Sequence, residues 1–112
     1  MKTGDIHWVE LPHAGGHEQS GRRPAVIMQE DEYAFSLPTT IVIPLSSAIA
    51  ALRFPGTTQV KATTMSGLRA DSVALAFQIR AIDRHRIKEH IGIVSPAELA
   101  EIREELRKLF GN

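Results

Sequence analysis

The chain has 112 residues, of which 43% are hydrophobic and 23% charged, and it contains no cysteine. This composition predicts a single globular domain over residues 1–112 and excludes two full domains, a disulfide framework and thiolate chemistry. The formal net charge is zero, with 13 Lys and Arg against 13 Asp and Glu, which counts against nucleic-acid binding unless basic residues gather on one surface.

No segment has the character of a membrane span or a secretory signal. The longest uncharged run, residues 33–52, is interrupted by serine, threonine and proline, so no transmembrane helix and no membrane contact are predicted. The first ten residues carry two acids and no apolar h-region. Together with the absence of cysteine, this favours a cytoplasmic location. Residues 61–94 hold six basic residues against three acidic ones, a weak signal that is more typical of a solvated surface.

Strands are expected through most of the chain, because short β-branched or alternating segments are separated by Gly- and Pro-rich connections. We expect Pro24 at the start of the second strand and Pro44 at the end of the third, where a missing N–H is tolerated. Residues 13–21 contain three glycines and should form a mobile loop. The predicted strands cover residues 6–11, 24–29, 39–45, 58–63, 72–77, 78–82 and 91–94.

The last segment has a helical period instead. Its apolar positions recur at steps of three and four: Leu99, Ile102, Leu106, Leu109 and Phe110. Ser95 and Glu98 form a capping-box pattern, Pro96 occupies the first helical position, and Gly111 follows the end. The order of elements therefore predicts a mainly β (α+β) fold: a small barrel or strongly bent antiparallel sheet with a C-terminal amphipathic helix.

The five histidines do not have the spacing of a metal site. No pair shows the i, i+4 pattern with a glutamate, and no cysteine can complete a tetrahedral site, so no metal site is predicted. His13 and His17 share one loop and could form an acid–base pair, although two solvated polar residues are the simpler interpretation. The Gly-rich nucleotide motifs and the Gly-x-Ser-x-Gly motif are absent.

Two adjacent arginines, Arg22 and Arg23, precede the second strand. A guanidinium fork matches phosphate oxygens and stabilises charge that develops on them, but a surface salt bridge or a contact with an acidic partner also fits. Ser46 and Ser47 follow the third strand. Their hydroxyls could cap the next turn or contact a substrate at the strand end.

Several segments resemble one known family in order and spacing. The most specific is Glu18-Gln19-x-Gly21-x-Arg23-Pro24, and the others are residues 4–9, 42–46, 71–75 and 78–80. Together they resemble the MazF/PemK (Kid) toxins of bacterial type II toxin–antitoxin systems, over nearly the whole chain.

This resemblance implies an SH3-like barrel homodimer with endoribonuclease activity. Such a toxin cleaves single-stranded RNA, mostly messenger RNA, at a short sequence without a metal or other cofactor. The 2′-hydroxyl attacks the adjacent phosphate and leaves a 2′,3′-cyclic phosphate and a free 5′-hydroxyl. The resemblance also implies a cognate antitoxin whose acidic, disordered tail lies across the RNA groove.

The catalytic residues carried over by the resemblance are Arg23 and Ser46. Arg23 would stabilise the phosphorane and could donate a proton, while Ser46 stands where family members often carry threonine and would hold a phosphate oxygen. Ser47 takes that role if the alignment shifts by one residue.

The other residues carried over are assigned to RNA binding. Glu18 and Gln19 would position RNA or order the loop, Ser47 would contact RNA, and the amide of Gln78 could read base edges. The general base stays open between Glu18, His17 and water, since a neutral arginine is rare at pH 7.

Two other function classes fit the sequence less well. A CcdB-like DNA gyrase poison would share the fold but relies on a C-terminal Trp-Gly-Ile, whereas this chain ends in Phe110-Gly111-Asn112. A peptide-binding SH3-like adaptor needs an aromatic groove, which Trp8, Tyr33 and four phenylalanines supply poorly. An adaptor has no need for Arg23 together with Ser46.

Overall fold

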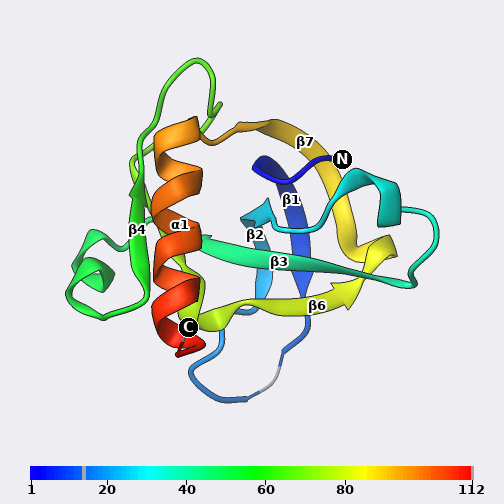
Figure 1. Cartoon of the computed structure of the whole chain (residues 1–112), viewed down its shortest axis with the longest axis horizontal. Helices are drawn as coiled ribbons and strands as arrows, with labels where there is room; N and C mark the ends of the chain where they lie inside the picture. Colours follow the sequence, from blue (N-terminus) through cyan, green and yellow to red (C-terminus); the bar gives the residue numbers. More distant parts are fainter. Residues whose placement is uncertain (14, 112) are drawn as a thin grey trace.

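The computed structural model describes residues 1–13 and 15–111; residue 14 of the predicted loop and residue 112 of the terminal tripeptide lie outside this range. Within it, seven antiparallel strands and one α-helix follow each other in chain order (Figure 1). They are β1 (Asp5–Leu11), β2 (Gly21–Ile27), β3 (Thr39–Ser46), β4 (Thr57–Val60), β5 (Ser72–Leu75), β6 (Arg80–Asp83), β7 (Ile87–Ile93) and α1 (Pro96–Leu109). Short 3-10 turns cover Asp31–Tyr33, Ile49–Arg53, Ala76–Gln78 and Arg84–Arg86.

Strand β3 is the centre of the bent sheet. Along one edge it pairs with β2, and along the other it pairs first with β6, over Thr39–Val42, and then with β5, at Leu45 and Ser46. The strand order is β4-β5-β3-β2-β1-β7, with β6 paired to β3 off that path. Figure 1 shows α1 beside β4 and in front of one end of β3, with β7 curving around the opposite side of the sheet. The predicted barrel-like antiparallel fold with a C-terminal helix is confirmed.

Both prolines lie inside strands, so the predicted strand ends at Pro24 and Pro44 were wrong. Strand β2 begins at Gly21, and its first four residues pair with β1 alone because pairing with β3 starts at Ala25. Strand β3 continues to Ser46; Pro44 lies between its pairing with β6 and its pairing with β5. A proline is tolerated at such places because one edge of the strand has no ladder there.

Other predicted boundaries also change. The strand expected over 58–63 ends at Val60, and the one expected over 72–77 ends at Leu75, where a 3-10 turn leads into β6. Strand β7 begins at Ile87, four residues before the predicted start. The first half of β7 is polar, Lys88-Glu89-His90, so the sequence there shows no apolar strand pattern. In the structure this half is nevertheless a strand that pairs with β1 along a single edge.

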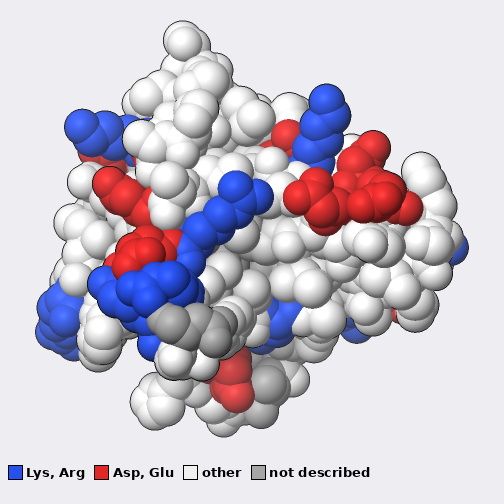
Figure 2. Space-filling view, in the orientation of Figure 1, with Lys and Arg blue, Asp and Glu red and all other residues white. Residues whose placement is uncertain are grey.

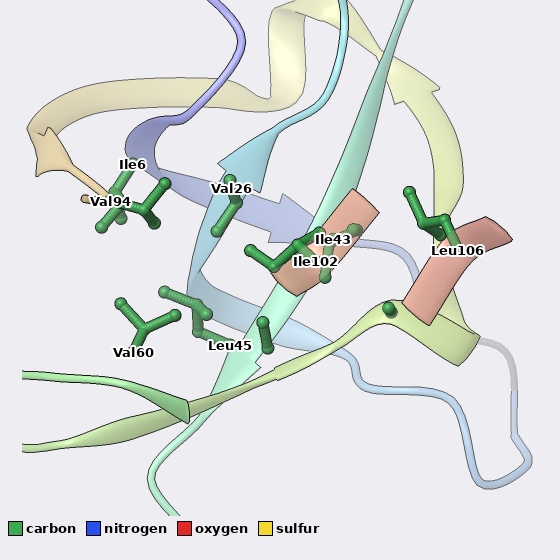
Figure 3. Packing of buried hydrophobic residues seen from close by; sticks show 10 residues of the cluster. Ile6, Val26, Ile43, Leu45, Val60, Val94, Ile102 and Leu106 are labelled. Carbon is green, nitrogen blue, oxygen red and sulfur yellow. The ribbon is translucent and has the colours of Figure 1, made fainter. Parts of the chain in front are cut away.

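The core consists of two clusters on opposite faces of the central strands. The first contains Ile6, Val26, Ile43, Leu45, Val60, Ala74, Ala76, Val94, Ile102 and Leu106 (Figure 3). The second contains Val9, Leu11, Ala25, Ile27, Val42 and Ile82. Neighbouring residues of β2 and β3 alternate between the clusters. Burial of both faces explains why β3 has a nearly continuous apolar sequence.

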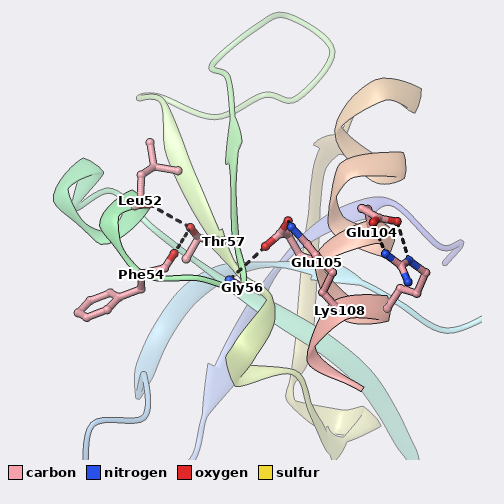
Figure 4. A network of polar contacts seen from close by, with 8 residues as sticks. Leu52, Phe54, Gly56, Thr57, Glu104, Glu105 and Lys108 are labelled. Carbon is pink, nitrogen blue, oxygen red and sulfur yellow. Dashed lines mark hydrogen bonds and ion pairs between the residues drawn. The ribbon is translucent and has the colours of Figure 1, made fainter. Parts of the chain in front are cut away.

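The C-terminal helix is fixed near both of its ends to the residues that flank strand β4. The predicted capping box is present: Ser95 Oγ accepts from the Glu98 N–H at 3.1 Å, and Glu98 Oε1 accepts from the Ser95 N–H at 2.9 Å. Glu98 Oε2 also accepts from the Lys61 N–H at 2.9 Å. One helical turn from the other end, Glu105 Oε1 accepts from the Gly56 N–H at 3.2 Å (Figure 4). The helix therefore holds both ends of β4 through its carboxylates.

Across the described residues, α1 is too short and too polar to span a bilayer, and no other helix meets that requirement. Figure 2 shows basic and acidic side chains interspersed over α1 on the face that carries it.

Candidate functional site

A first hollow, with a volume of about 490 Å³, lies between the start of β2, the middle of β7 and the segment before β5. Its charged lining consists of three arginines, one glutamate and one histidine: Arg22, Arg23, Arg69, Glu89 and His90. Trp8, Ser47 and Ser72 also line it. The chain's zero net charge thus conceals a hollow with an excess of positive charge, which favours an anionic ligand.

A second hollow, of about 650 Å³, has a polar side and an apolar side. The polar side carries His17, Gln19, Ser46 and Gln78, and the apolar side includes Phe54, Pro55, Phe77 and Leu109. The rings of Phe54 and Phe77 meet edge to face with centroids 6.1 Å apart. Both side chains are more than 40% exposed, so they offer a surface on which a flat or apolar group can pack.

The loop before β2 is tied to the sheet by three side chains. Gln78 Oε1 accepts from the Gln19 N–H at 2.8 Å, and Gln78 Nε2 donates to the His17 carbonyl at 3.4 Å. Arg80 Nη2 donates to the Gln19 carbonyl, and Arg23 Nε donates to the Ser20 carbonyl at 2.9 Å. These contacts give residues 17–20 of the predicted loop a defined path.

Among the three side chains that hold the loop, Arg80 is the one for which the sequence indicated no role. It is partly buried beneath the loop, and this desolvation lowers the pKa of its guanidinium, while the charge of Glu18 opposes the shift. Its Nε is buried and has no hydrogen-bond partner among the described residues. The only sequence signal was its place two residues after Gln78 in a segment shared with the family.

The two neighbouring arginines have different surroundings. Arg22 Nη2 pairs with Glu89 Oε2 at 2.5 Å, and its guanidinium lies 4.9 Å from the Trp8 ring centroid. The hydrogen bond from Arg22 lowers the pKa of the Glu89 carboxyl. Arg23 uses only Nε, so within residues 1–13 and 15–111 its Nη1 and Nη2 groups have no hydrogen-bond acceptor. Of the pair, Arg23 is the one whose two terminal nitrogens both lack an acceptor among the described residues, whereas one terminal nitrogen of Arg22 is engaged by Glu89.

The two serines at the end of β3 line different hollows. Ser47 is exposed and lines the first hollow together with Arg23. Ser46 is 8% exposed, lines the second hollow, and accepts a hydrogen bond from the Ala48 N–H at 3.1 Å. The Ser46 hydroxyl thus binds the backbone two residues further on and borders a hollow, but the 3-10 turn Ile49–Arg53 that follows has no side-chain cap. Ser46 and Ser47 mark the boundary between the two hollows.

The remaining predicted residues lie in or beside the tied loop. Glu18 is exposed there, and Gln19 lines the second hollow with Gln78. The amide oxygen and the amide nitrogen of Gln78 each already bind the loop backbone, which leaves one lone pair and one N–H with which to read a base. The ring of His13 contacts Ser20 Oγ at 3.4 Å rather than His17, and both histidines are exposed, which agrees with two solvated loop residues.

Comparison with known proteins identifies the family. The chain matches the family described as PemK-like, MazF-like toxin of type II toxin–antitoxin system over residues 2–110, and it belongs to that family. It is 39% identical to Endoribonuclease MazF9 of Mycobacterium tuberculosis, over 96% of this chain and 93% of that protein. It is 33% identical to Endoribonuclease MazF of Staphylococcus saprophyticus, over 91% of this chain and 84% of that protein.

Solved structures agree with this assignment. The crystal structure of MazF (Form-I) from Deinococcus radiodurans superimposes with a TM-score of 0.85 at 29% identity, over 100% of this chain and 97% of that chain. A MazE–MazF structure (Form-II) from the same organism gives a TM-score of 0.78 at 29% identity, over 99% of this chain and 96% of that chain. The family predicted from the loop motif is confirmed.

Proposed function

We propose that this protein is a sequence-specific, metal-independent endoribonuclease toxin that cleaves single-stranded RNA to 2′,3′-cyclic phosphate and 5′-hydroxyl ends. Residues 1–112 form its single toxin domain. The observation that carries the proposal is Arg23, whose two Nη groups have no hydrogen-bond acceptor among the described residues, in a hollow lined by three arginines. The relatives named Endoribonuclease MazF support the class of enzyme.

The proposed reaction needs little covalent chemistry from the protein, because the ribose 2′-hydroxyl is the nucleophile. The protein must hold the chain in line and stabilise charge that develops on the phosphorane. Arg23 is suited to both tasks, since its Nε bond to the Ser20 carbonyl at 2.9 Å fixes the guanidinium while Nη1 and Nη2 donate to phosphate oxygens. It can also supply the proton that the leaving 5′-oxygen needs. Glu18, His17 and water are the candidate general bases.

We propose Ser46 as the hydroxyl partner of Arg23. Its oxygen accepts from the Ala48 N–H, which fixes the side chain and leaves the hydroxyl proton free to donate to a phosphate oxygen. An RNA strand that passes from the first hollow to the second crosses the end of β3, where Ser46 and Ser47 lie. Ser47 is then an RNA-binding residue beside Arg23, with Gln19 and Gln78 on the other side of the crossing and Glu18 exposed in the adjoining loop.

The same surface accounts for the proposed partners. A cognate antitoxin with an acidic, disordered tail would compete with RNA for the arginine-lined hollow, and MazE–MazF structures are among the structural neighbours. For the homodimer, Phe54, Phe77 and Leu109 form an exposed apolar surface on one side of the second hollow. We place the protein in the cytoplasm, where both RNA and antitoxin are available.

Substitution of Arg23 provides the direct test. Arg23→Ala removes the fixed cation and should reduce the cleavage rate by roughly 10²–10³-fold, the usual effect of losing one transition-state donor. Arg103→Ala, at an exposed position of α1, is the matched control and should cleave normally. A folded Arg23→Ala variant with normal cleavage would remove Arg23 from the mechanism.

A second pair of variants tests the choice of serine. Ser46→Ala should lose most activity and Ser47→Ala should be milder. The opposite order would assign the hydroxyl role to Ser47, which shares the hollow of Arg23. The gyrase-poison alternative is not favoured, because the matched family and relatives are MazF toxins.

A further inference from the structure

Three potential metal ligands meet where β1 pairs with β7. Asp5 and His7 are two residues apart on β1 and therefore point to the same face, and His90 of β7 lies directly opposite His7. The register shifts on either side of His7. One potential ligand atom from each of the three residues lies within 4.8 Å of the others.

The ring of His7 is already oriented as a ligand. Its Nδ1 lies 2.9 Å from the Lys88 carbonyl, and because a carbonyl only accepts, Nδ1 carries the proton. Nε2 then presents a lone pair. That atom is buried and has no hydrogen-bond partner among the residues described. A histidine whose other nitrogen donates to a carbonyl is the arrangement that fixes metal-binding histidines.

The other two ligands need only a small movement. His90 Nε2 is 3.9 Å from Asp5 Oδ1, and the side chain of His90 is 55% exposed, so it is free to rotate. Asp5 is held from one side, because its Oδ2 accepts from the Lys2 N–H at 2.9 Å. Bonds of about 2.0–2.1 Å in a tetrahedral zinc site place ligand atoms about 3.3 Å apart, so the gap between His90 and Asp5 closes by about 0.6 Å.

We propose that Asp5, His7 and His90 form a binding site for one divalent transition-metal ion such as Zn²⁺. Two imidazole nitrogens and one carboxylate oxygen suit Zn²⁺ and its neighbours in the transition series better than Mg²⁺ or Ca²⁺. Three protein ligands leave a fourth position for water. The ion bridges β1 to β7, the strand that leads directly into α1, and so clamps the end of the sheet. His90 also lines the first hollow, so the ion would lie at the edge of that hollow, but the proposed RNA cleavage does not require it.

The test is a titration of untagged protein with ZnCl₂, read by calorimetry and by thermal unfolding. One ion per chain should bind, and at a free concentration of 100 times Kd the ratio of folded to unfolded protein should rise about 100-fold. His90→Ala, at an exposed position, should fold normally and lose the stabilisation. His85→Ala is the matched control, because His85 is also an exposed histidine with an aspartate, Asp83, at 3.0 Å, and it should keep the stabilisation.

Histidine NMR gives a second, independent measurement. Without metal, His7 should be the tautomer protonated at Nδ1, and Zn²⁺ should shift the Nε2 resonances of His7 and His90 while leaving His85 unchanged. The proposal is overturned if Zn²⁺ does not bind, if His90→Ala binds as tightly as the unmodified protein, or if the shifted resonances belong to other histidines.

Discussion

The loop before β2 is held by Gln78, and Gln78→Ala tests whether that residue acts by ordering the loop. The substitution removes two hydrogen bonds: one from the Gln19 N–H at 2.8 Å and one to the His17 carbonyl at 3.4 Å. Arg80 and Arg23 still hold the carbonyls of Gln19 and Ser20, so the chain path should survive. The loop should loosen without detaching.

The size of the effect follows from the two bonds. A neutral hydrogen bond contributes about 0.5–1.5 kcal/mol net, and the bond to His17 is at the long end of the range. Their combined loss is about 1.5 kcal/mol, which corresponds to roughly a tenfold increase in the fraction of open loop. The global free energy of unfolding should fall by no more than this amount.

Hydrogen exchange of the Gln19 amide measures the effect directly. Its exchange should accelerate at least about tenfold in Gln78→Ala, since that amide loses its acceptor. Gln59→Ala is the matched control: Gln59 lies on β4, away from the loop, and its substitution should leave Gln19 exchange unchanged. Cleavage should slow for all RNA sequences alike. Unchanged Gln19 exchange combined with an altered cut-site preference would refute the positioning role and make Gln78 a direct base reader.

Three further predictions concern the helix cap, a close backbone approach and a surface ion pair. Ser95→Ala removes the capping box and should lower the free energy of unfolding by about 1 kcal/mol in urea titrations. An unchanged midpoint of urea unfolding would mean that the Lys61–Glu98 bond alone fixes the start of the helix. Gly92→Ala would place a Cβ 2.3 Å from the Ser66 carbonyl oxygen, so it should destabilise the protein by about 1–3 kcal/mol or more. A variant that unfolds at the same temperature as the unmodified protein would contradict this close packing. Arg22 lowers the pKa of Glu89, so this pair stabilises the folded protein above the unfolded-state pKa of Glu89, and the stabilisation is lost as the pH falls through the lowered pKa. Arg22→Met should raise the Glu89 pKa toward its ordinary range, as measured by carboxyl ¹³C NMR. An unchanged Glu89 pKa in this variant would show that the pair does not persist in solution.

The C-terminal helix was the element most completely predictable from the sequence. Its cap, first-turn proline and apolar stripe are all local signals, and the structure places Ser95, Glu98 and Pro96 as expected. The strand ends were less predictable. Whether Pro24 or Pro44 ends a strand depends on which neighbouring strand has stopped pairing there, and that information lies elsewhere in the chain.

The same contrast holds for the candidate site. Arg23 was found because it belongs to a short contiguous motif. Arg80 was missed as a loop anchor because its partner, the Gln19 carbonyl, is 61 residues away. The cluster of Asp5, His7 and His90 could not be predicted from the sequence for the same reason, because it depends on the pairing of β1 with β7. Spacing along the chain predicts metal sites only when the ligands share one local element.

The most direct test of the proposed function is the end chemistry of RNA cut by the purified protein in EDTA. A long single-stranded RNA should be cut at discrete positions, each leaving a 2′,3′-cyclic phosphate and a 5′-hydroxyl, and Arg23→Ala should cut it roughly 10²–10³-fold more slowly. RNA that stays intact with the unmodified protein, or products that end in a 5′-phosphate, would contradict the proposed mechanism.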